Sequence, residues 1–478
     1  MKISVKTLGL FAGPAFFLII SRLSHLDGLS PQAWYVLGVG AWMVTWWITE
    51  ATPMAVAALL PIVLFPALGV FPLAQATAPY ASPIIFLFMG GFFLALGLEH
   101  HGLHRRIALN LVRLTGTSAN GIIFGFMLAT AFLSMWISNT ASTIMMLPIA
   151  TSVTALIHHT VANKKGFNLF ALSLMLGIAY AANIGGMATI IGTPPNVVFV
   201  GYAEELLHIE IDFSRWMLIG IPISGILLLV TFLMLTQVLF KNRLGTMAAA
   251  TDLINTEIAK MGRMGRKEKM VAMVFGLTAF MWIFKRPLNL AFGSDILNDT
   301  GTAIIGGILM FALPTNFRKG KFLLPWKATK RLPWGILLLF GGGMTLAKGM
   351  ESTGLIQLIA DVVAANPMST LLVYLILIGS MLFLTELMSN VALATIYIPV
   401  VIGIAHGLGL NPLILAIPVA MASSCAFMMP ISTPPNAIVF SSGHIRVKQM
   451  IRAGFWLNVL SVLVLVVAAF TLIEWVFG

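Results

Sequence analysis

The sequence predicts an all-α polytopic membrane protein, with about eleven transmembrane helices and two re-entrant helical hairpins. Of its 478 residues, 59% are hydrophobic and only 9% are charged, against roughly 25% charged in an average soluble domain. Apolar stretches close to the roughly 20 residues that span a bilayer recur along the whole chain. Four of these stretches are interrupted near the middle, and the interruptions form two matching pairs.

This composition excludes several classes of protein. An intrinsically disordered chain or a cytosolic enzyme would contain far more charge, and the single cysteine, Cys425, cannot form an intrachain disulfide. The net charge of +12 also occurs in nucleic-acid-binding proteins. A membrane protein gains the same excess by concentrating Lys and Arg in its cytoplasmic loops, so we expect the lipid bilayer and no nucleic acid as partner.

Uninterrupted spans account for most of the predicted crossings. They are expected near residues 8–24, 32–49, 53–72, 83–99, 214–240, 271–286, 299–314, 334–350 and 453–477. The first apolar run lacks a small-residue cleavage site, and further spans follow it. We therefore predict a retained transmembrane helix within residues 1–30 rather than a signal peptide.

Two interrupted stretches are predicted to be re-entrant hairpins. Residues 120–158 carry Ser-Asn-Thr at 138–140, and residues 369–405 carry Ser-Asn-Val at 389–391. At such a tip, the N-terminus of the second helix places unpaired N–H groups and a positive dipole end beside hydroxyl and amide side chains. Each tip suits one carboxylate, so two converging tips suit an anion with two acceptor ends. A single copy of the motif has the simpler explanation of helix capping.

The other two interrupted stretches are predicted to cross the membrane as broken helices. Residues 168–202 carry Gly-Thr-Pro-Pro-Asn at 192–196, and residues 412–440 carry Ser-Thr-Pro-Pro-Asn at 432–436. Lipid cannot satisfy the carbonyl groups that a proline pair frees, so such breaks persist only where they line a cavity or contact an ion. Free carbonyls beside hydroxyl and amide oxygens suit sodium. A single Pro-Pro is usually a kink, whereas the duplication of both motifs favours paired anion and cation sites.

The basic residues predict the orientation of the chain. With the N-terminus in the cytoplasm and the C-terminus in the periplasm or outside the cell, all but five of the 28 Lys and Arg residues fall on the cytoplasmic side. The five exceptions are Arg22, Arg215, Lys285, Arg286 and Lys348. The opposite orientation would violate the positive-inside rule.

Three landmarks recur in the same order and predict an internal repeat. A glycine-rich segment at 88–103 matches one at 340–355, and each is followed by a hairpin tip and then by a Pro-Pro break. In the orientation above, the two hairpins enter from opposite sides, so the repeats are inverted, as in secondary transporters. We place the first repeat at 31–240, a cytoplasmic linker at 241–270 and the second repeat at 271–478.

Two further features allow more than one interpretation. His100, His101 and His104 resemble a metal cluster, but with the arginines beside them they are typical of an amphipathic helix on the inner membrane surface. Glu386 lies just before the second hairpin tip. It is either a functional acid within the membrane or a hydrogen-bonding anchor for the hairpin helix.

With these motifs, the sequence resembles the divalent anion/sodium symporter family, which includes bacterial dicarboxylate transporters of the INDY type and mammalian di- and tricarboxylate carriers. The resemblance covers nearly the whole chain, and residues 424–439 resemble the family signature. It implies eleven spans, a homodimer through scaffold helices, and elevator movement of a transport domain that carries the site.

The resemblance also implies the ligands. The first sodium ion would bind Ser134, Ser138, Asn139 and a carbonyl of Gly192, and the second would bind Thr385, the carbonyl of Met388, Asn390 and Ser432. The substrate would contact Asn139, Thr140 and Asn390, with Thr193, Pro194, Val391, Thr433 and Pro434 lining its pocket. Val391 stands where a threonine would complete the second motif, which removes one hydroxyl donor. No Lys or Arg is present at either tip, so bound cations would balance the anion.

We therefore predict a sodium-coupled symporter of the inner membrane that imports C4 dicarboxylates such as succinate, malate or fumarate. A dicarboxylate exchanger and a sodium-coupled citrate or sulfate carrier of the same family are the alternatives. An intramembrane enzyme would need Glu386 and the histidines at one depth, which the predicted topology opposes. An ion channel is opposed by the inverted repeat.

Overall fold

The computed structural model describes residues 4–22, 29–365 and 368–478, and these are almost entirely helical. Seven helices of the described part are long and apolar enough to cross a membrane, or eight if one bent pair counts as a span. The shorter apolar helices include Ala119–Ser134 and Thr370–Leu384, which are the first halves of the two hairpins. The all-α membrane fold is therefore confirmed, and the total of eleven crossings stays a prediction.

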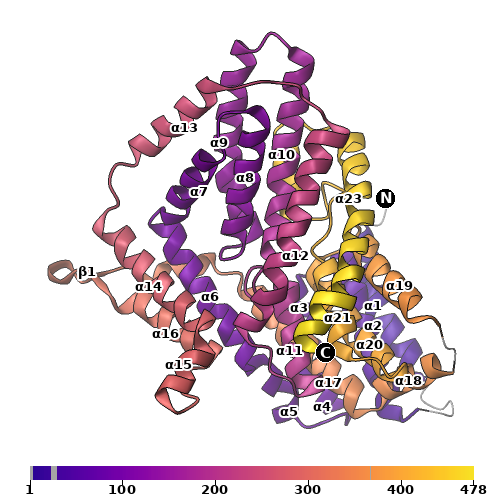
Figure 1. The fold of residues 1–478 in the computed structure, drawn as a ribbon. Coiled ribbons are helices and arrows are strands. Elements are labelled where there is room, and N and C mark those ends of the chain that lie inside the picture. The colour runs from indigo at the N-terminus through magenta and orange to yellow at the C-terminus, as the bar shows by residue number, and fades with distance from the viewer. Residues whose placement is uncertain (1–3, 23–28, 366–367) are drawn as a thin grey trace.

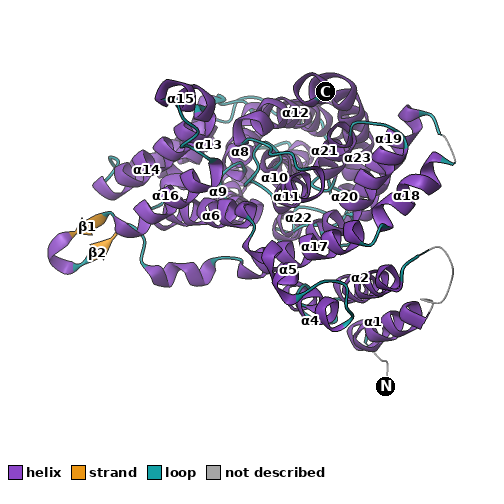
Figure 2. Ribbon diagram, turned by 90° about the horizontal axis from the view of Figure 1, so that it is seen from below, coloured by secondary structure: helices purple, strands orange, loops and turns teal. Residues whose placement is uncertain are grey.

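The N-terminal helices form a layer at one edge of the molecule (Figure 2). They are α1 (Val5–Arg22), α2 (Pro31–Thr49), α3 (Met54–Ala57), α4 (Leu60–Ala67), α5 (Leu73–Thr77) and the 3-10 turn η2 (Ala78–Ala81). Helix α6 (Pro83–His100) follows and lies outside this layer (Figure 2). The continuous span expected at 53–72 is instead divided between α3 and α4. Pro61 explains the difference, because it lacks the N–H that would bond the carbonyl of Ala57 in a continuous helix, whereas Pro66 lies within α4.

The first hairpin and the first broken helix follow. The elements are α7 (Leu103–Leu114), α8 (Ala119–Ser134), α9 (Asn139–Thr160), α10 (Lys164–Gly186), α11 (Pro194–Leu207), α12 (Phe213–Leu233) and its π-helical continuation η3 (Met234–Leu239). Helix α10 lies at the centre of this group (Figure 1). Every residue from Phe170 to Gly186 is buried, as expected of a helix that is enclosed on all sides.

The middle of the chain lies at the periphery. It contains α13 (Ala248–Lys260), α14 (Arg266–Ile283), α15 (Lys285–Phe292), α16 (Asp299–Ala312), β1 (Pro314–Asn316), η4 (Phe317–Lys319), β2 (Lys321–Phe322) and η5 (Trp326–Arg331). Helices α14 and α15 meet at an angle of 78°. The antiparallel strands pair Pro314 with Phe322 and Asn316 with Lys321, and this small β-hairpin, which the sequence did not predict, projects from the helical body (Figures 1 and 2).

The C-terminal elements repeat the order of the first group. They are α17 (Trp334–Ser352), α18 (Leu355–Ala364), α19 (Thr370–Leu384), α20 (Asn390–Gly407), α21 (Pro412–Ala422), α22 (Pro434–Phe440), α23 (Val447–Ala468), η6 (Ala469–Ile473) and α24 (Glu474–Phe477). The hairpin α19–α20 thus corresponds to α8–α9, and the broken pair α21–α22 corresponds to α10–α11. The repeat and linker boundaries, and the inversion of the repeats, stay predictions.

Corresponding helices begin with the same chemistry. Ser138 caps α9 by accepting a hydrogen bond from the N–H of Ala141, at 3.2 Å, and Ser389 caps α20 through the N–H of Ala392, at 3.5 Å. The second halves of both broken helices begin with proline at their first two positions, where the missing N–H costs nothing. These caps fix where each hairpin turns and where each broken helix resumes.

Candidate functional site

A cavity of about 790 Å³ lies where the two hairpin tips and the two breaks meet. Its polar wall contains Ser138–Ala141, Gly192–Pro195, Met388–Val391 and Ser432–Pro435. The volume is within the range of about 300–1,000 Å³ that is usual for small-molecule pockets. Segments about 250 residues apart in sequence therefore contribute to one site, as the duplicated motifs predict.

The cavity brings together most of the residues that the resemblance implied. All eight residues expected to contact substrate line it: Asn139, Thr140, Thr193, Pro194, Asn390, Val391, Thr433 and Pro434. Of the remaining expected sodium ligands, Ser138, Gly192, Met388 and Ser432 line it as well. Ser134 and Thr385 are fully buried and lie behind the two asparagines.

Oxygen atoms converge at the first tip. Ser134 Oγ donates a hydrogen bond to Asn139 Oδ1 at 2.5 Å. A Cβ added to Gly186 would lie 2.6 Å from Asn139 Oδ1 and 3.2 Å from the carbonyl oxygen of Gly192. A Cβ added to Gly192 would lie 3.0 Å from the carbonyl oxygen of Ser134. The two glycines therefore let hydroxyl, amide and carbonyl oxygens approach closely, and these are donor types that suit a sodium ion.

The second tip repeats this arrangement with different residues. Thr385 Oγ1 donates to Asn390 Oδ1 at 2.7 Å and is 3.0 Å from the carbonyl oxygen of Ser423. The hydroxyl and the asparagine are five residues apart in both tips. Ser432 Oγ donates to the carbonyl oxygen of Met429 at 2.7 Å. Both tips thus hold an asparagine side chain in place by a hydroxyl of the preceding helix.

The asparagine of each Pro-Pro break satisfies the carbonyl groups that the break frees. Asn196 Nδ2 donates to the carbonyl oxygen of Thr189 at 2.8 Å and lies 3.3 Å from those of Gly186 and Met187. Asn436 Nδ2 donates to the carbonyl oxygens of Ala426 and Met429, at 3.0 and 3.1 Å. From the sequence, amide oxygens beside the breaks were expected to suit sodium. Here the two asparagines stabilise unwound backbone within the apolar core.

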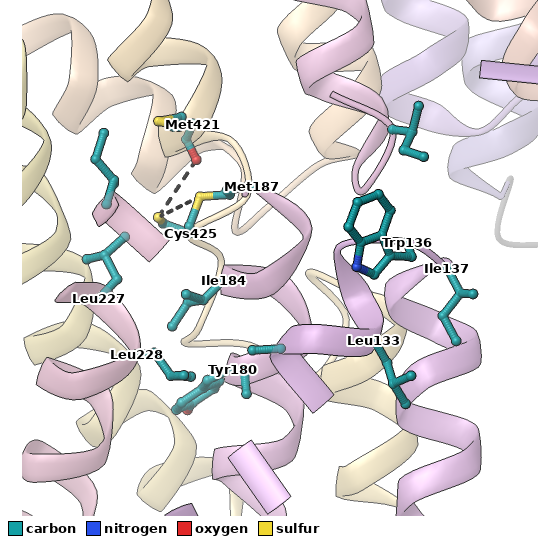
Figure 3. Packing of buried hydrophobic residues seen from close by; sticks show 14 of the residues in the cluster. Leu133, Trp136, Ile137, Tyr180, Ile184, Met187, Leu227, Leu228, Met421 and Cys425 are labelled. Atoms are coloured by element: carbon teal, nitrogen blue, oxygen red, sulfur yellow. Dashed lines mark hydrogen bonds between the residues drawn. The ribbon is translucent and has the colours of Figure 1, made fainter. Parts of the chain in front are cut away.

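Helix α10 connects the two repeats at the site. Tyr180 donates through its hydroxyl to the carbonyl oxygen of Phe427 at 2.8 Å, and Asn183 Nδ2 donates to Thr433 Oγ1 at 3.2 Å. Figure 3 shows Tyr180 beside the buried cluster around Cys425, whose Sγ is 4.0 Å from Met187 Sδ. Sequence reasoning missed Tyr180 and Asn183, and their only signal is their polarity within a wholly buried apolar helix.

Glu386 is an anchor and does not line the cavity. Its carboxylate accepts hydrogen bonds from three consecutive backbone N–H groups, those of Phe427, Met428 and Met429, and from Asn458 Nδ2. Of the two interpretations that the sequence left open, the structure shows the hydrogen-bonding one. The anchored segment is the unwound part of the second broken helix, not the hairpin helix itself.

The histidines have structural partners. His101 Nε2 is 2.7 Å from the carbonyl oxygen of Leu323, and His104 Nδ1 is 3.0 Å from that of Leu98. Within residues 4–22, 29–365 and 368–478, no group of three His, Cys, Asp or Glu side chains is arranged to hold a metal ion. These contacts attach the start of α7 to α6 and to the segment after the β-hairpin.

The cavity extends from the tips to the ends of α2 and α6. Glu50, Glu99 and Arg331 line this end of the cavity, which we call the mouth, and an Arg331 N–H group is 2.7 Å from Glu99 Oε2. Arg331 is the only basic residue among the described residues that line the cavity. The positively charged group therefore lies at the mouth, away from the polar wall formed by the tips and breaks.

Comparison with known families and structures gives the family. The family described as "Sodium:sulfate symporter transmembrane region" matches residues 4–478. The chain belongs to this family of divalent anion/sodium symporters. The resemblance that the sequence motifs indicated is thereby confirmed, and the chain is a multi-pass membrane transporter by family.

Two staphylococcal transporters are similar to nearly the whole of this chain. The chain is 39% identical over 480 residues to a protein of Staphylococcus saprophyticus named sodium-dependent dicarboxylate transporter SdcS, covering 99% of this chain and 92% of that protein. The protein of the same name from Staphylococcus aureus strain USA300 is 39% identical over 479 residues, with the same coverage.

Two solved structures share the fold at low sequence identity. The YdaH transporter of Alcanivorax borkumensis matches with a TM-score of 0.58 at 14% identity, covering 97% of both chains. MtrF of Neisseria gonorrhoeae, described as one of a class of antimetabolite efflux pumps, matches with a TM-score of 0.56 at 11% identity, covering 98% of this chain and 95% of that one. At these identities the likeness concerns the fold alone.

Proposed function

We propose that this symporter imports C4 dicarboxylates, such as succinate, malate or fumarate, together with sodium ions. The names of the two staphylococcal relatives support both the substrate class and the coupling ion. The observation that carries the proposal is the duplicated polar wall of the cavity, where two hairpin tips and two breaks face one space.

The anion is bound by neutral donors in this proposal. Asn139 and Asn390 each begin a helix, so each substrate carboxylate meets an amide side chain beside the unpaired N–H groups and positive dipole end of α9 or α20. Thr140 adds a hydroxyl at the first tip, while Val391 adds none at the second. A four-carbon dicarboxylate has one carboxylate for each tip.

Sodium ions supply the balancing charge. The first would bind Ser134, Ser138, Asn139 and the Gly192 carbonyl, and the second would bind Thr385, the Met388 carbonyl, Asn390 and Ser432. Sodium orders the tips first, and the ordered tips form the anion site. Because Asn139 and Asn390 belong to both sets, sodium and dicarboxylate must raise each other's affinity by the same factor.

The direction of opening follows from charge. The mouth of the cavity contains the ends of α2 and α6 and the start of α17, and the neighbouring segments carry Arg105, Arg106 and the basic run at 318–331. The positive-inside rule places this side in the cytoplasm. The structure then corresponds to an inward-facing state, with elevator movement of a transport domain within a homodimer as the route outward.

Uptake of labelled succinate into proteoliposomes tests the proposal. Vesicles receive an inward sodium gradient, an equal potassium gradient, or unlabelled succinate inside without a gradient. Stimulation by sodium alone supports symport, and stimulation only by internal succinate identifies an exchanger. Citrate and sulfate replace succinate in parallel, because uptake of either without succinate uptake would contradict the substrate assignment. Asn139→Ala and Asn390→Ala should each abolish sodium-stimulated uptake.

A further inference from the structure

Glu386 is an acid in the interior of the second repeat, with a side chain only 3% exposed. Its Oε1 accepts from the N–H groups of Phe427 and Met428, at 2.7 and 2.8 Å, and from Asn458 Nδ2 at 2.8 Å. Its Oε2 accepts from the N–H of Met429 at 3.2 Å. No Lys, Arg or His of the described chain lies within ion-pair distance of this carboxylate.

The anchored backbone leads directly to the second break. Between α21 and α22 the chain is unwound, so three successive N–H groups at 427–429 have no acceptor within a helix. The carboxylate accepts from all three. The next fixed contact is at Met429, whose carbonyl oxygen accepts from the N–H and the Oγ of Ser432, at 3.3 and 2.7 Å.

The opposite side of Glu386 is the second hairpin. The residue directly before it is Thr385, whose hydroxyl is bonded to Asn390. Glu386 thus connects the two chain segments that supply the expected ligands of the second sodium ion, the hairpin tip and the break. Helix α23 closes the arrangement from behind, since a Cβ added to Gly454 would lie 2.5 Å from Met428 Cα.

The first repeat has no equivalent acid. Met135 follows Ser134 as Glu386 follows Thr385, and there the hairpin and the break are joined by Thr189 Oγ1, which donates to the carbonyl oxygen of Met135 at 2.5 Å. A backbone carbonyl and a hydroxyl replace the carboxylate. Removing Glu386 should therefore act first on the second of the two sites.

We propose that Glu386 is a positioning residue for the second sodium site, where its carboxylate holds residues 427–429 and so sets Ser432 against Thr385 and Asn390. Its negative charge also favours a cation in the adjacent space, where apolar surroundings screen charge weakly. The proposal rests on the proposed sodium-coupled function, because it assigns a residue to one of its two ion sites.

Glu386→Gln tests the role. The substitution keeps the size of the side chain, removes the charge and turns one acceptor into a donor that opposes a backbone N–H. We expect the sodium concentration for half-maximal succinate uptake to rise about tenfold, because the variant loses one charge-assisted contact. The KM for succinate at saturating sodium should change by less than about threefold, because the sodium-ordered anion site is then restored.

Thermal unfolding in sodium chloride and in potassium chloride separates positioning from simple stabilisation. A purely structural role lowers the Tm of Glu386→Gln equally in both salts. If Glu386 positions the sodium site, Glu386→Gln loses part of the additional stabilisation that sodium gives the wild-type protein.

Asn458→Leu removes one of the four donors and keeps the carboxylate. It should shift the sodium dependence in the same direction by a smaller factor, and it replaces Glu386→Gln as the test if that variant does not fold. Glu474→Gln, at an exposed acid of α24, is the matched control.

The outcomes distinguish this proposal from the proposed function. One outcome overturns only the role of Glu386. In it, sodium stimulates uptake by the wild-type protein, and the sodium dependence of Glu386→Gln is unchanged. If Glu386→Gln does not fold, Asn458→Leu takes its place in this comparison. Equal loss of Tm in both salts, without a change in half-maximal sodium, does the same. Wild-type uptake that sodium does not stimulate overturns both.

Discussion

Gly186 shows how a single missing side chain shapes the proposed first sodium site. It ends α10, and a Cβ at this position would lie 2.6 Å from Asn139 Oδ1, closer than carbon and oxygen atoms approach without displacement. The asparagine cannot simply turn away, because Ser134 holds its Oδ1. A methyl group at Gly186 would therefore occupy space that the oxygen atoms border.

Gly186→Ala should raise the sodium concentration for half-maximal uptake by about tenfold or abolish uptake, since Asn139, a proposed sodium ligand, must move. The measurement is sodium-dependent succinate uptake in proteoliposomes. Gly225→Ala is the matched control: this glycine lies in α12 with no other atom within 4 Å of an added Cβ. Wild-type sodium dependence in Gly186→Ala would show that no ion occupies this space.

Residues of the site were predictable where they occur twice. The Ser-Asn and Thr-Pro-Pro-Asn motifs stand out because a chance arrangement rarely repeats in order, and the structure brings both copies to one cavity. Tyr180, Asn183 and Asn458 each occur once, within apolar helices, where a lone polar residue has many explanations. Their partners are backbone carbonyls, the Thr433 hydroxyl and a carboxylate, which only the folded chain brings near.

At the scale of elements, an ion-pair cluster joins the start of α12 to α15 and α16. Lys285 is 6% exposed; its Nζ contacts a carboxylate oxygen of Asp212 and lies 3.3 Å from Asp299 Oδ1. Arg286 contacts Asp212 Oδ2 at 2.7 Å. Burial raises the pKa of Asp212, but its hydrogen bonds and the charges of Lys285 and Arg286 outweigh burial, and the pKa is lowered.

Asp212→Asn should destabilise the protein by about 1–2 kcal/mol near pH 7, because Lys285 loses one of its buried partners and keeps Asp299. A lowered pKa means that this contribution is fully present above the ordinary aspartate pKa of about 4 and is lost as pH falls through the lowered value. Thermal unfolding of both proteins in detergent should therefore differ at neutral pH and converge in acid.

Glu210→Gln is the control for this cluster. Glu210 Oε1 is 3.5 Å from Lys285 Nζ, but the Glu210 side chain is 73% exposed, so solvent screens the pair. The Tm of Glu210→Gln should therefore match that of the wild type. A difference between wild type and Asp212→Asn that grows on acidification would contradict the assigned direction of the Asp212 pKa.

Element boundaries were predictable where local chemistry marks them. Serine caps and paired prolines mark the starts of α9, α20, α11 and α22. The segment at 53–72 was expected as one helix because its composition is uniformly apolar, although its internal prolines divide it. The β1–β2 hairpin was missed because two strands of three and two residues leave no periodic pattern.

At the scale of the whole molecule, the cavity extends from the hairpin tips to the ends of α2 and α6, on the side that we propose faces the cytoplasm. The sequence predicted the composition of the polar wall but not its side of opening. Opening depends on how the two groups of helices are placed relative to one another, and both placements of an inverted repeat satisfy the same sequence pattern.

A cysteine at Leu387 reports this opening. The side chain lines the cavity and is 73% exposed. We expect Leu387→Cys to react with a membrane-impermeant maleimide in inside-out vesicles and to be protected in right-side-out vesicles. The wild-type protein is the background control, because Cys425 is fully buried. Ser294→Cys, on the exposed loop before α16, should show the opposite pattern. Labelling of Leu387→Cys only from outside would contradict the inward-facing assignment.

Arg331 lies at the mouth, and no other basic residue is among the described residues that line the cavity. This arrangement has an electrical consequence. A dianion accompanied by two sodium ions is neutral, so a transport cycle with only these ions moves no net charge and is indifferent to membrane voltage. Each further sodium ion adds one elementary charge, on which a potential of 100 mV acts with about 2.3 kcal/mol. The net charge moved per dicarboxylate, measured as a current, therefore gives the number of sodium ions in excess of two.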